Sequence, residues 1–465
     1  MNVDRGRFDS LAAGLSHSAP LQACRPIRPQ RMNPVSFPRW WRHVPSLQRV
    51  VADLLAGELA QMRPGRPQPA GAWRAESDLR ADLGADSLEL IGLATSMEGM
   101  LHLRRAQDEP LLARTRLGDW LAVAAAGLEE GGDSVTFRTS GSSGTPKAIR
   151  HETALLWQEA VYLASLFPGR RRIVSLAPSH HIYGFLFSVL LPHALDIGPA
   201  MVVDLRAYSP AAVAQQLQPG DLVLGFPDFW RAFNEAGDTG GAGDPGPTGG
   251  SGGSGQPGEQ GWRFPPDVVG VTSTAPCPPE LARAVLASGL ARLVQVYGSS
   301  ETAGVGWRDD PEAPYALFPF WSRTPDPATL ARRAPDGRRL DYPLQDRLDW
   351  PEDGRFRPLG RIDHAVQVGG VNVFPAYVAD VLRLHPQVQE ASVRLMRADE
   401  GQRLKAFVVP RGGVPADTSL LRADLYRWMA ARLTAAECPA AYSFGPDLPR
   451  QASGKLTDWI IDAWA

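Results

Sequence analysis

A loop rich in glycine and hydroxyl residues, at positions 139–147, constrains the fold of this chain more than any other segment. It follows the run SVTFRT at 134–139, whose β-branched and aromatic residues predict a strand. The backbone N–H groups and hydroxyls of such a turn suit a phosphate group, and Lys147 adds positive charge. The loop is not a Walker loop, because Pro146-Lys147-Ala148 stands where Gly-Lys-[Ser/Thr] is needed.

Helix-like and strand-like segments alternate after this loop. This order predicts an α/β layer with mainly parallel strands. The segments are 153–167, 173–177, 184–193, 200–204 and 222–226. A tract of Gly, Ser and Pro at 240–261 predicts a flexible insertion, and the strand-like runs on its two sides can belong to one sheet.

The last hundred residues predict a small α+β domain at 364–465. The predicted strands are 365–368, 390–396 and 404–409, and the predicted helices are 376–384 and 419–433.

Composition narrows the class of protein. The chain has 465 residues, which is enough for two to four domains, and its 48 basic and 50 acidic residues give a net charge of -2. Nothing in this balance indicates a nucleic-acid partner. The three cysteines show no metal-ligand spacing and favour a reducing, cytoplasmic location. The sequence predicts no membrane span, because no apolar run is long enough.

The amino-terminal part divides at about residue 44. Residues 1–43 are rich in Arg, Pro and Ser and predict a disordered lead, with Met32 as an alternative start to Met1. From residue 45 the apolar stripe Leu47, Val50, Val51, Leu54 and Leu55 predicts an amphipathic helix. Two further helix-like stretches complete a short predicted bundle at 44–128.

The run DLGADSLE at 82–89 resembles the attachment site of acyl-carrier proteins. The resemblance implies that Ser87, at a helix start, carries 4′-phosphopantetheine. The alternative is that Asp86-Ser87 is only a helix cap. Gly92 departs from the pattern, since many carriers have an acidic residue there.

Several motifs together resemble the AMP-forming ligases, which include acyl- and aryl-CoA synthetases. In YGSSET, at 297–302, the resemblance implies that Tyr297 stacks on adenine, Ser300 meets the phosphate and Glu301 holds Mg²⁺. Asp346 and Arg361 match the ribose-binding pair in spacing, although a structural ion pair is the alternative. Asp363 matches the hinge residue between the large and small domains of these ligases. The loop 369–375 resembles the loop that lines their pantetheine tunnel.

The remaining implied site residues belong to the phosphate loop, the acid pocket and the end of the chain. Lys455, in the motif PRQASGK at 449–455, matches the catalytic lysine, which would stabilise charge at the α-phosphate. His181 matches the gate of the acid pocket, although a buried structural histidine is the alternative. Ser273 and Thr274 replace two glycines in the pocket, which favours an aryl or other small acid. Phosphate-loop and further pocket residues are Thr139, Ser140, Ser142, Ser143, Thr145, Lys147 and Ser299.

The implied fold is a multidomain α/β and α+β protein. It combines a four-helix acyl-carrier bundle at 44–128, a truncated large adenylation domain of layered sheets and helices at 134–361, and the small domain at 364–465. The side left uncovered by the truncation must be covered by the carrier or by a second subunit of a homodimer.

The implied function is ATP-dependent adenylation of a carboxylic acid and its transfer to the chain's own phosphopantetheine thiol. Its partners would be a phosphopantetheinyl transferase and acyl-acceptor enzymes such as ketosynthases. The alternatives are a CoA ligase with an accessory carrier and a non-catalytic carrier scaffold.

Overall fold

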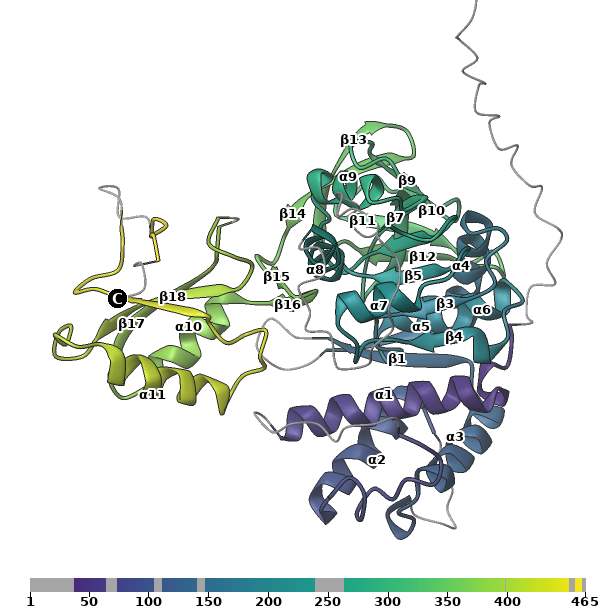
Figure 1. The fold of residues 1–465 in the computed structure, drawn as a ribbon, viewed down its shortest axis with the longest axis horizontal. Coiled ribbons are helices and arrows are strands. Elements are labelled where there is room, and N and C mark those ends of the chain that lie inside the picture. The colour runs from purple at the N-terminus through teal and green to yellow at the C-terminus, as the bar shows by residue number, and fades with distance from the viewer. Residues whose placement is uncertain are drawn as a thin grey trace, which may run out of the picture. The chain divides into compact units, whose positions relative to one another are not determined.

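A computed structural model of the chain describes residues 37–63, 73–103, 111–139, 147–238, 263–397, 399–450 and 456–461. Within these residues the largest element is a mixed nine-stranded sheet in the order β13-β14-β9-β8-β7-β6-β5-β3-β4 (Figure 1). The predicted insertion at 240–261 and most of the predicted lead at 1–43 lie outside the described residues.

One half of this sheet is parallel, as the alternation of segments predicts. Its central strands β3, β5 and β6 are short, fully buried runs rich in aliphatic residues, which is typical of strands covered on both faces. β5 and β6 pair directly, so the runs flanking the insertion do belong to one sheet. The strands are β3 (Ile173–Ser175), β4 (Val202–Asp204), β5 (Leu222–Gly225), β6 (Val269–Thr272) and β7 (Arg292–Ser299).

Helices connect these strands and cover the sheet. The segment predicted as one helix at 184–193 is a broken helix, α5 (Ile182–Phe185), the π-helical turn η3 (Leu186–Leu190) and α6 (Leu191–Ala194). The 3-10 turn η4 (Pro199–Met201) leads into β4. The other helices are α4 (Thr153–Leu166), α7 (Pro210–Gln216), α8 (Pro227–Asp238) and α9 (Pro279–Ala287).

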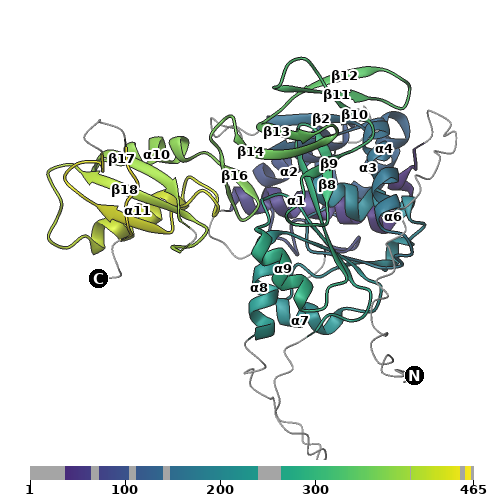
Figure 2. The same cartoon turned by 90° about the horizontal axis from the view of Figure 1, so that it is seen from above.

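The other half of the sheet is antiparallel, and sequence patterns did not identify its strands. They are β8 (Ala303–Arg308), β9 (Tyr315–Leu317), β13 (Asp346–Glu352) and β14 (Arg355–Arg361). A separate sheet holds β10 (Trp321–Arg323), β11 (Thr329–Arg333) and β12 (Arg339–Pro343) (Figure 2). Most of these strands are short or largely exposed, so they lack the apolar signal of a buried strand.

The small domain matches its predicted elements closely and has a hydrophobic core of its own. Its three-stranded sheet has the order β17-β18-β19. The elements are β15 (Val366–Val368), β16 (Val371–Val373), α10 (Pro375–Arg383), β17 (Val388–Leu395), β18 (Leu404–Pro410), α11 (Ser419–Ala430) and β19 (Ala441–Phe444).

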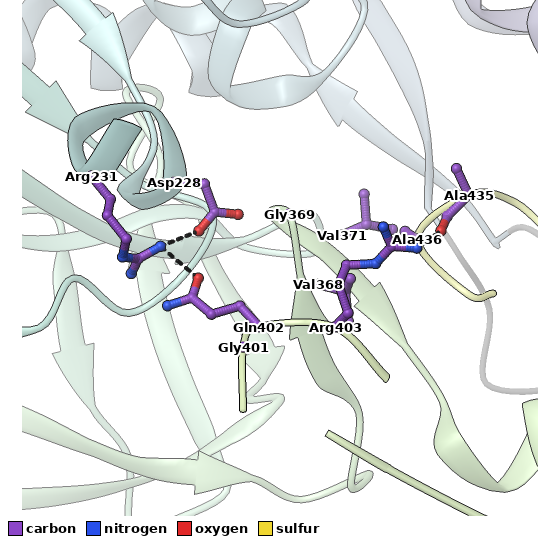
Figure 3. A pocket seen from close by; sticks show the side chains of 10 residues that line it. All are labelled: Asp228, Arg231, Val368, Gly369, Val371, Gly401, Gln402, Arg403, Ala435 and Ala436. Carbon is purple, nitrogen blue, oxygen red and sulfur yellow. Dashed lines mark hydrogen bonds and ion pairs between the residues drawn. The ribbon is translucent and has the colours of Figure 1, made fainter. Parts of the chain in front are cut away.

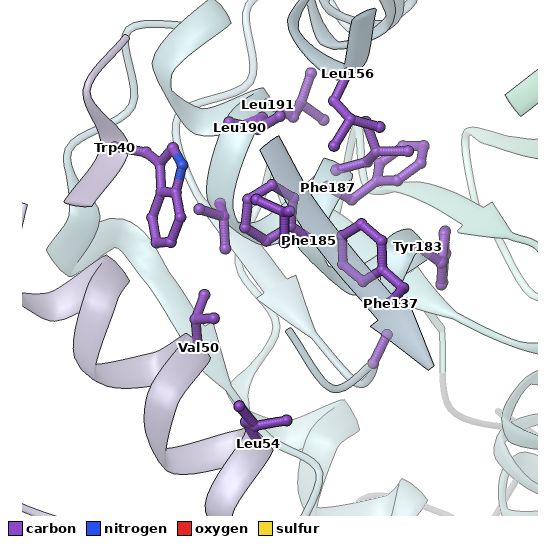
Figure 4. Packing of buried hydrophobic residues seen from close by; sticks show 14 of the residues in the cluster. Trp40, Val50, Leu54, Phe137, Leu156, Tyr183, Phe185, Phe187, Leu190 and Leu191 are labelled. Atoms are coloured by element: carbon purple, nitrogen blue, oxygen red, sulfur yellow. The ribbon is translucent and has the colours of Figure 1, made fainter. Parts of the chain in front are cut away.

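The amino-terminal segment is not confirmed as a separate four-helix carrier bundle. Its described part contains three α-helices, α1 (Val44–Met62), α2 (Ser87–Leu101) and α3 (Leu117–Gly131), and the short 3-10 turns η1 (Trp40–Arg42) and η2 (Leu111–Ala113). Val50 and Leu54 of α1 belong to the same buried cluster as Phe137 and Phe185 of the large domain (Figure 4). The segment therefore shares its core with the large domain, and α1 covers part of the side that a truncated domain would leave open.

The predicted disordered lead extends too far. Trp40 is fully buried, Trp41 is 4% exposed, and Trp40 packs edge-on against Phe185 at 5.1 Å between ring centroids. Burial of two indole rings stabilises the fold by several kcal/mol, roughly 25 cal/mol per Å² of apolar surface. Residues from Phe37 onward are thus ordered by this packing, which the Arg- and Pro-rich composition concealed.

Candidate active site

The phosphate loop closes a β-hairpin formed by β1 (Ser134–Thr139) and β2 (Lys147–Glu152). Thr139 and Lys147 are the last residue pair of the hairpin, so the loop begins and ends at one place. Lys147 is exposed there. The side chain of Thr139 and the residues Ser140, Ser142, Ser143 and Thr145 lie outside the described part of the chain.

The turn between β7 and β8 carries the predicted adenine and magnesium motif. Its backbone is held by Ser299 Oγ, which accepts hydrogen bonds from the N–H groups of Glu301 and Thr302, both at 3.2 Å. A Cβ at Gly298 would lie 2.1 Å from the carbonyl oxygen of Ala303, so only glycine fits there. These contacts fix a tight turn and leave the Glu301 side chain partly exposed.

Three of the predicted nucleotide residues lie side by side. Tyr297 Oη donates a hydrogen bond to Asp346 Oδ2 at 2.7 Å, and Asp346 stands directly opposite Arg361 in the pairing of β13 and β14. Burial, and then the charge of Asp346, raises the pKa of Tyr297, so the phenol remains a donor.

The ion pair of Arg361 is formed with Asp363, the predicted hinge residue. Nε and Nη2 of Arg361 bond the two oxygens of Asp363 at 2.7 and 2.5 Å. Burial lowers the pKa of Arg361, but this pair and the charges of Asp346 and Glu301 outweigh it and raise the pKa overall. Four of the predicted site residues are therefore coupled electrostatically.

His151 was missed by sequence reasoning, and it links the two nucleotide motifs. It lies on β2, four residues after Lys147, and its Nε2 is 2.7 Å from the carbonyl oxygen of Ser300. Burial lowers its pKa to about 4, so the ring is neutral and donates this hydrogen bond. No sequence motif marks the residue, and only the pairing of distant segments shows its role.

His151→Gln is expected to weaken the acid sensitivity of folding. The buried imidazole must gain a proton on unfolding, so the free energy of unfolding falls as pH drops from 6.5 to about 4, by up to about 3 kcal/mol. Glutamine can donate the same bond without titrating. Thermal unfolding is measured between pH 4 and 8. Above about pH 7 the unfolding midpoints of the two proteins should change with pH in nearly the same way, and below it the midpoint of the variant should fall less than that of the wild type. Identical acid-side slopes would contradict this assignment.

The predicted acid-pocket residues lie at the carboxyl ends of parallel strands, where ligands bind in open α/β sheets. His181 follows β3, is exposed, and its ring lies 4.3 Å from that of His180. Ser273 follows β6 and donates to the carbonyl of Val296 at 2.9 Å, and Thr274 has a φ of +76°. Tyr183 donates to the Gly225 carbonyl of β5 and is buried.

A cavity of about 490 Å³ lies beside the predicted tunnel loop (Figure 3). Gly369 and Gly370 form the tight β15–β16 turn, with φ values of +57° and +78°. Arg231 donates to Asp228 on the same helix at 2.9 Å and, across this cavity, to Gln402 at 2.7 Å. The lining residues are Asp228, Arg231, Val368, Gly369, Val371, Gly401, Gln402, Arg403, Ala435 and Ala436.

Lys455 lies outside the described residues, but both sides of its segment are anchored. Arg450 and Leu456 form a β-bridge around residues 451–455. The buried Nζ of Lys405 donates to the carbonyl of Trp459 and to Glu400, both at 2.6 Å. Sequence reasoning missed Lys405, which looks like an ordinary strand residue.

Ser87 is exposed at the first position of α2, beside Asp86, which caps the helix. Asp86 Oδ1 accepts from the N–H of Glu89, and Glu89 accepts from the N–H of Asp86, at 2.8 and 2.9 Å. Arg63 at the end of α1 binds Glu89 through two bonds of 2.6 Å. This capping box accounts for Asp86 without a carrier function.

No helix in the described part of the chain has the length and apolar character to span a membrane. Among the described residues, no group of three or more His, Cys, Asp or Glu side chains is arranged to hold a metal ion.

Family models match two parts of the chain, an AMP-binding enzyme domain at residues 134–320 and an AMP-binding enzyme C-terminal domain at 377–455. A 4-coumarate–CoA ligase from Cereibacter sphaeroides is 36% identical over 434 residues, covering 89% of this chain and 96% of that protein. One from Halorhodospira halophila is 35% identical, covering 88% of this chain and 97% of that protein.

The fold is also similar to that of an amide bond synthetase from Marinactinospora thermotolerans. The TM-score is 0.54 at 19% identity, with 88% of this chain and 92% of that chain covered. The chain therefore belongs to the AMP-binding enzyme family, the adenylate-forming enzymes of the acyl-CoA synthetase type.

The likeness to the Cereibacter protein extends into the amino-terminal segment. The match leaves 11% of the 465 residues uncovered, about 51 residues. This is fewer than the segment 44–128 contains, so at least part of that segment is shared with the relative.

Proposed function

We propose that this chain is an AMP-forming ligase that adenylates an aromatic or other small carboxylic acid and transfers it to the thiol of coenzyme A. The observation that carries the proposal is the match over nearly the whole length of proteins named 4-coumarate–CoA ligase. The arrangement of Tyr297, Asp346 and Arg361 beside the β7–β8 turn supports a nucleotide site.

In the proposed first step, the acid carboxylate attacks the α-phosphate of ATP and pyrophosphate leaves. The loop 139–147 and Lys147 hold the phosphates, and Lys455 stabilises the charge that develops at the α-phosphate. Tyr297 stacks on the adenine, and Asp346 and Arg361 bind the ribose.

Mg²⁺ would bind at Glu301 together with the nucleotide. A single partly exposed carboxylate fits a cation that takes most of its ligands from phosphate oxygens and water. When bound, the ion neutralises phosphate charge. Glu301 contributes one ligand, and Ser299 holds its backbone in place.

In the proposed second step, the small domain rotates about Asp363 and the thiol replaces AMP. The ion pair of Asp363 with Arg361 then couples the hinge directly to the ribose-binding residue. The loop at Gly369–Gly370 would line the path of the thiol.

Coenzyme A is favoured as acceptor over the chain's own Ser87 because α1 shares the core of the large domain. A carrier must move its arm between sites, whereas a segment fixed by a shared core cannot swing freely. One observation supports the alternative, in which the acyl group is transferred to phosphopantetheine on Ser87 of the same chain. Ser87 is exposed next to Leu88 and Ile91, which are 77% and 48% exposed.

Ser87→Ala distinguishes the two acceptors. With ATP, coenzyme A and a panel of aryl and small acids, wild type and variant are expected to form acyl-CoA at rates within about twofold of each other. Chromatography with mass detection measures the product. The comparison is repeated after treatment with a phosphopantetheinyl transferase, with mass measurement of the intact protein.

The opposite outcome would establish the carrier function. It requires an acyl mass on the phosphopantetheinylated wild type, none on Ser87→Ala, and no acyl-CoA from either protein. A wild type that releases no pyrophosphate with any acid would contradict ligase activity itself.

A further inference from the structure

Helix α1 contacts the segment that contains the predicted gate of the acid pocket. Three of its residues, spaced four apart, lie on one face of the helix: Arg49, Asp53 and Gly57. Each contacts a part of the large domain between residues 179 and 206. This row lies beside the apolar stripe of the helix and is not part of it, so its contacts need a reason beyond burial of the apolar face.

Arg49 fixes the first turn of this contact. Its Nη1 donates to the carbonyl of Ser188 at 2.9 Å and its Nη2 to that of Val202 at 3.1 Å. Both acceptors are backbone groups of the large domain. These bonds therefore set the position of α1 along the π-helical turn η3 and the start of β4.

Asp53, one turn further along α1, binds Ser179 in the segment that contains the predicted gate. Its Oδ2 accepts two hydrogen bonds of 2.7 Å from Ser179, one from the backbone N–H and one from the hydroxyl. Its Oδ1 pairs with Arg206, which also binds Asp204. Ser179 is fully buried and Asp53 is 9% exposed, so these charge-assisted bonds are shielded from solvent.

Gly57, a further turn along α1, packs against the ring of His180, the residue after Ser179. A Cβ at Gly57 would lie 3.0 Å from Nε2 and 3.2 Å from Cε1 of the imidazole, so the ring lies almost against the helix backbone. On its other side the ring contacts His181. The Nδ1 atom is buried, and no hydrogen-bond partner is found for it among the described residues. Packing between α1 and His181 therefore fixes the ring.

We propose that α1 forms the outer support of the acid pocket, and that Asp53 and Gly57 are positioning residues that set which acid the enzyme accepts. Asp53 fixes Ser179, and Gly57 sets how far His180, and with it His181, projects into the pocket. The inference rests on the proposed ligase function. It gives a role in that function to α1, which belongs to the segment 44–128 that the sequence predicted to be a carrier.

Gly57→Ala tests this directly. The added methyl must displace His180 and, through ring contact, His181. We expect the KM for the acid to rise about tenfold, or the ranking of acids to change, while the KM for ATP stays within about twofold. Gly99→Ala is the matched control, since Gly99 is also a helical glycine and its Cβ would meet no atom within 4 Å. Pyrophosphate release with the acid panel measures the KM for the acid and the KM for ATP in the wild type and in both variants.

Ser179→Ala gives a second, milder readout should Gly57→Ala unfold. It removes the hydroxyl bond to Asp53 and keeps the backbone bond. We expect a rise of about threefold or more in the acid KM, without a change in the ATP KM. Thermal unfolding shows which variants are folded.

The outcomes separate the two proposals. An active wild type with an unchanged acid KM and ranking in every folded variant overturns the positioning role and leaves the ligase function standing. Equal increases in the acid and ATP constants also overturn it, because they indicate general damage. A wild type without activity toward any acid overturns both.

Discussion

Lys455→Ala is expected to lower the rate of acyl-adenylate formation by on the order of 100-fold or more. The proposed role of Lys455 is to place a cation beside the α-phosphate as negative charge develops there. Removing the cation leaves that charge unbalanced in the transition state. The β-bridge between Arg450 and Leu456 does not involve the side chain that is removed. Acid-dependent pyrophosphate exchange measures this step.

The second half-reaction provides the control. Lys455→Ala supplied with a synthetic acyl-adenylate is expected to transfer the acyl group to coenzyme A within about threefold of the wild-type rate. Lys455→Arg, which keeps the charge, should recover part of the exchange activity. Normal exchange in Lys455→Ala would show that another group supplies the cation.

Lys405→Met is expected to lower the free energy of unfolding of the small domain by about 3–5 kcal/mol. Lys405 is completely buried, and its ammonium group lies 2.6 Å from Glu400 and 3.1 Å from Asp458. Methionine fills a similar volume but leaves these carboxylates without their cation. It also loses the bond to Trp459, so we expect adenylation to fall together with stability. Chemical denaturation and pyrophosphate exchange measure the two effects.

A double variant tests whether the charge pair causes this loss. Glu400→Gln removes the more buried of the two carboxylates, which is 8% exposed at its side chain. Because the two residues interact directly, Lys405→Met with Glu400→Gln should lose less than the sum of the single losses. Additive losses would mean that Lys405 acts through packing alone.

The sequence predicted well those elements whose signal is local. Runs of buried aliphatic residues such as Leu222–Gly225 and Val269–Thr272 predict strands directly, and their alternation with helices implies parallel pairing. Three strands and two helices of the small domain were predicted to within a few residues for the same reason, whereas β16 and β19 were not predicted. The motif around Tyr297 was identified from its resemblance to the AMP-forming ligases, and the structure adds why Gly298 is needed in its tight turn.

Other features depend on partners that are distant along the chain. Arg361 and Asp346 have the spacing of a pair, yet Arg361 binds Asp363, because the side chain reaches two residues along its own chain rather than across to β13. His151 donates to Ser300 from 149 residues away. Such contacts depend on which distant segments pack together, and a single sequence does not show this.

The amino-terminal segment shows the difference most clearly. By itself the sequence determined the helix α1, its apolar stripe and the cap at Asp86, since these depend on neighbours within two turns. Only the tertiary structure shows which parts of the large domain α1 contacts. Asp53 on a helix is an ordinary solvent-facing residue until Ser179, 126 positions away, brings two donors to its carboxylate. Burial then makes that contact strong, because water no longer competes for it.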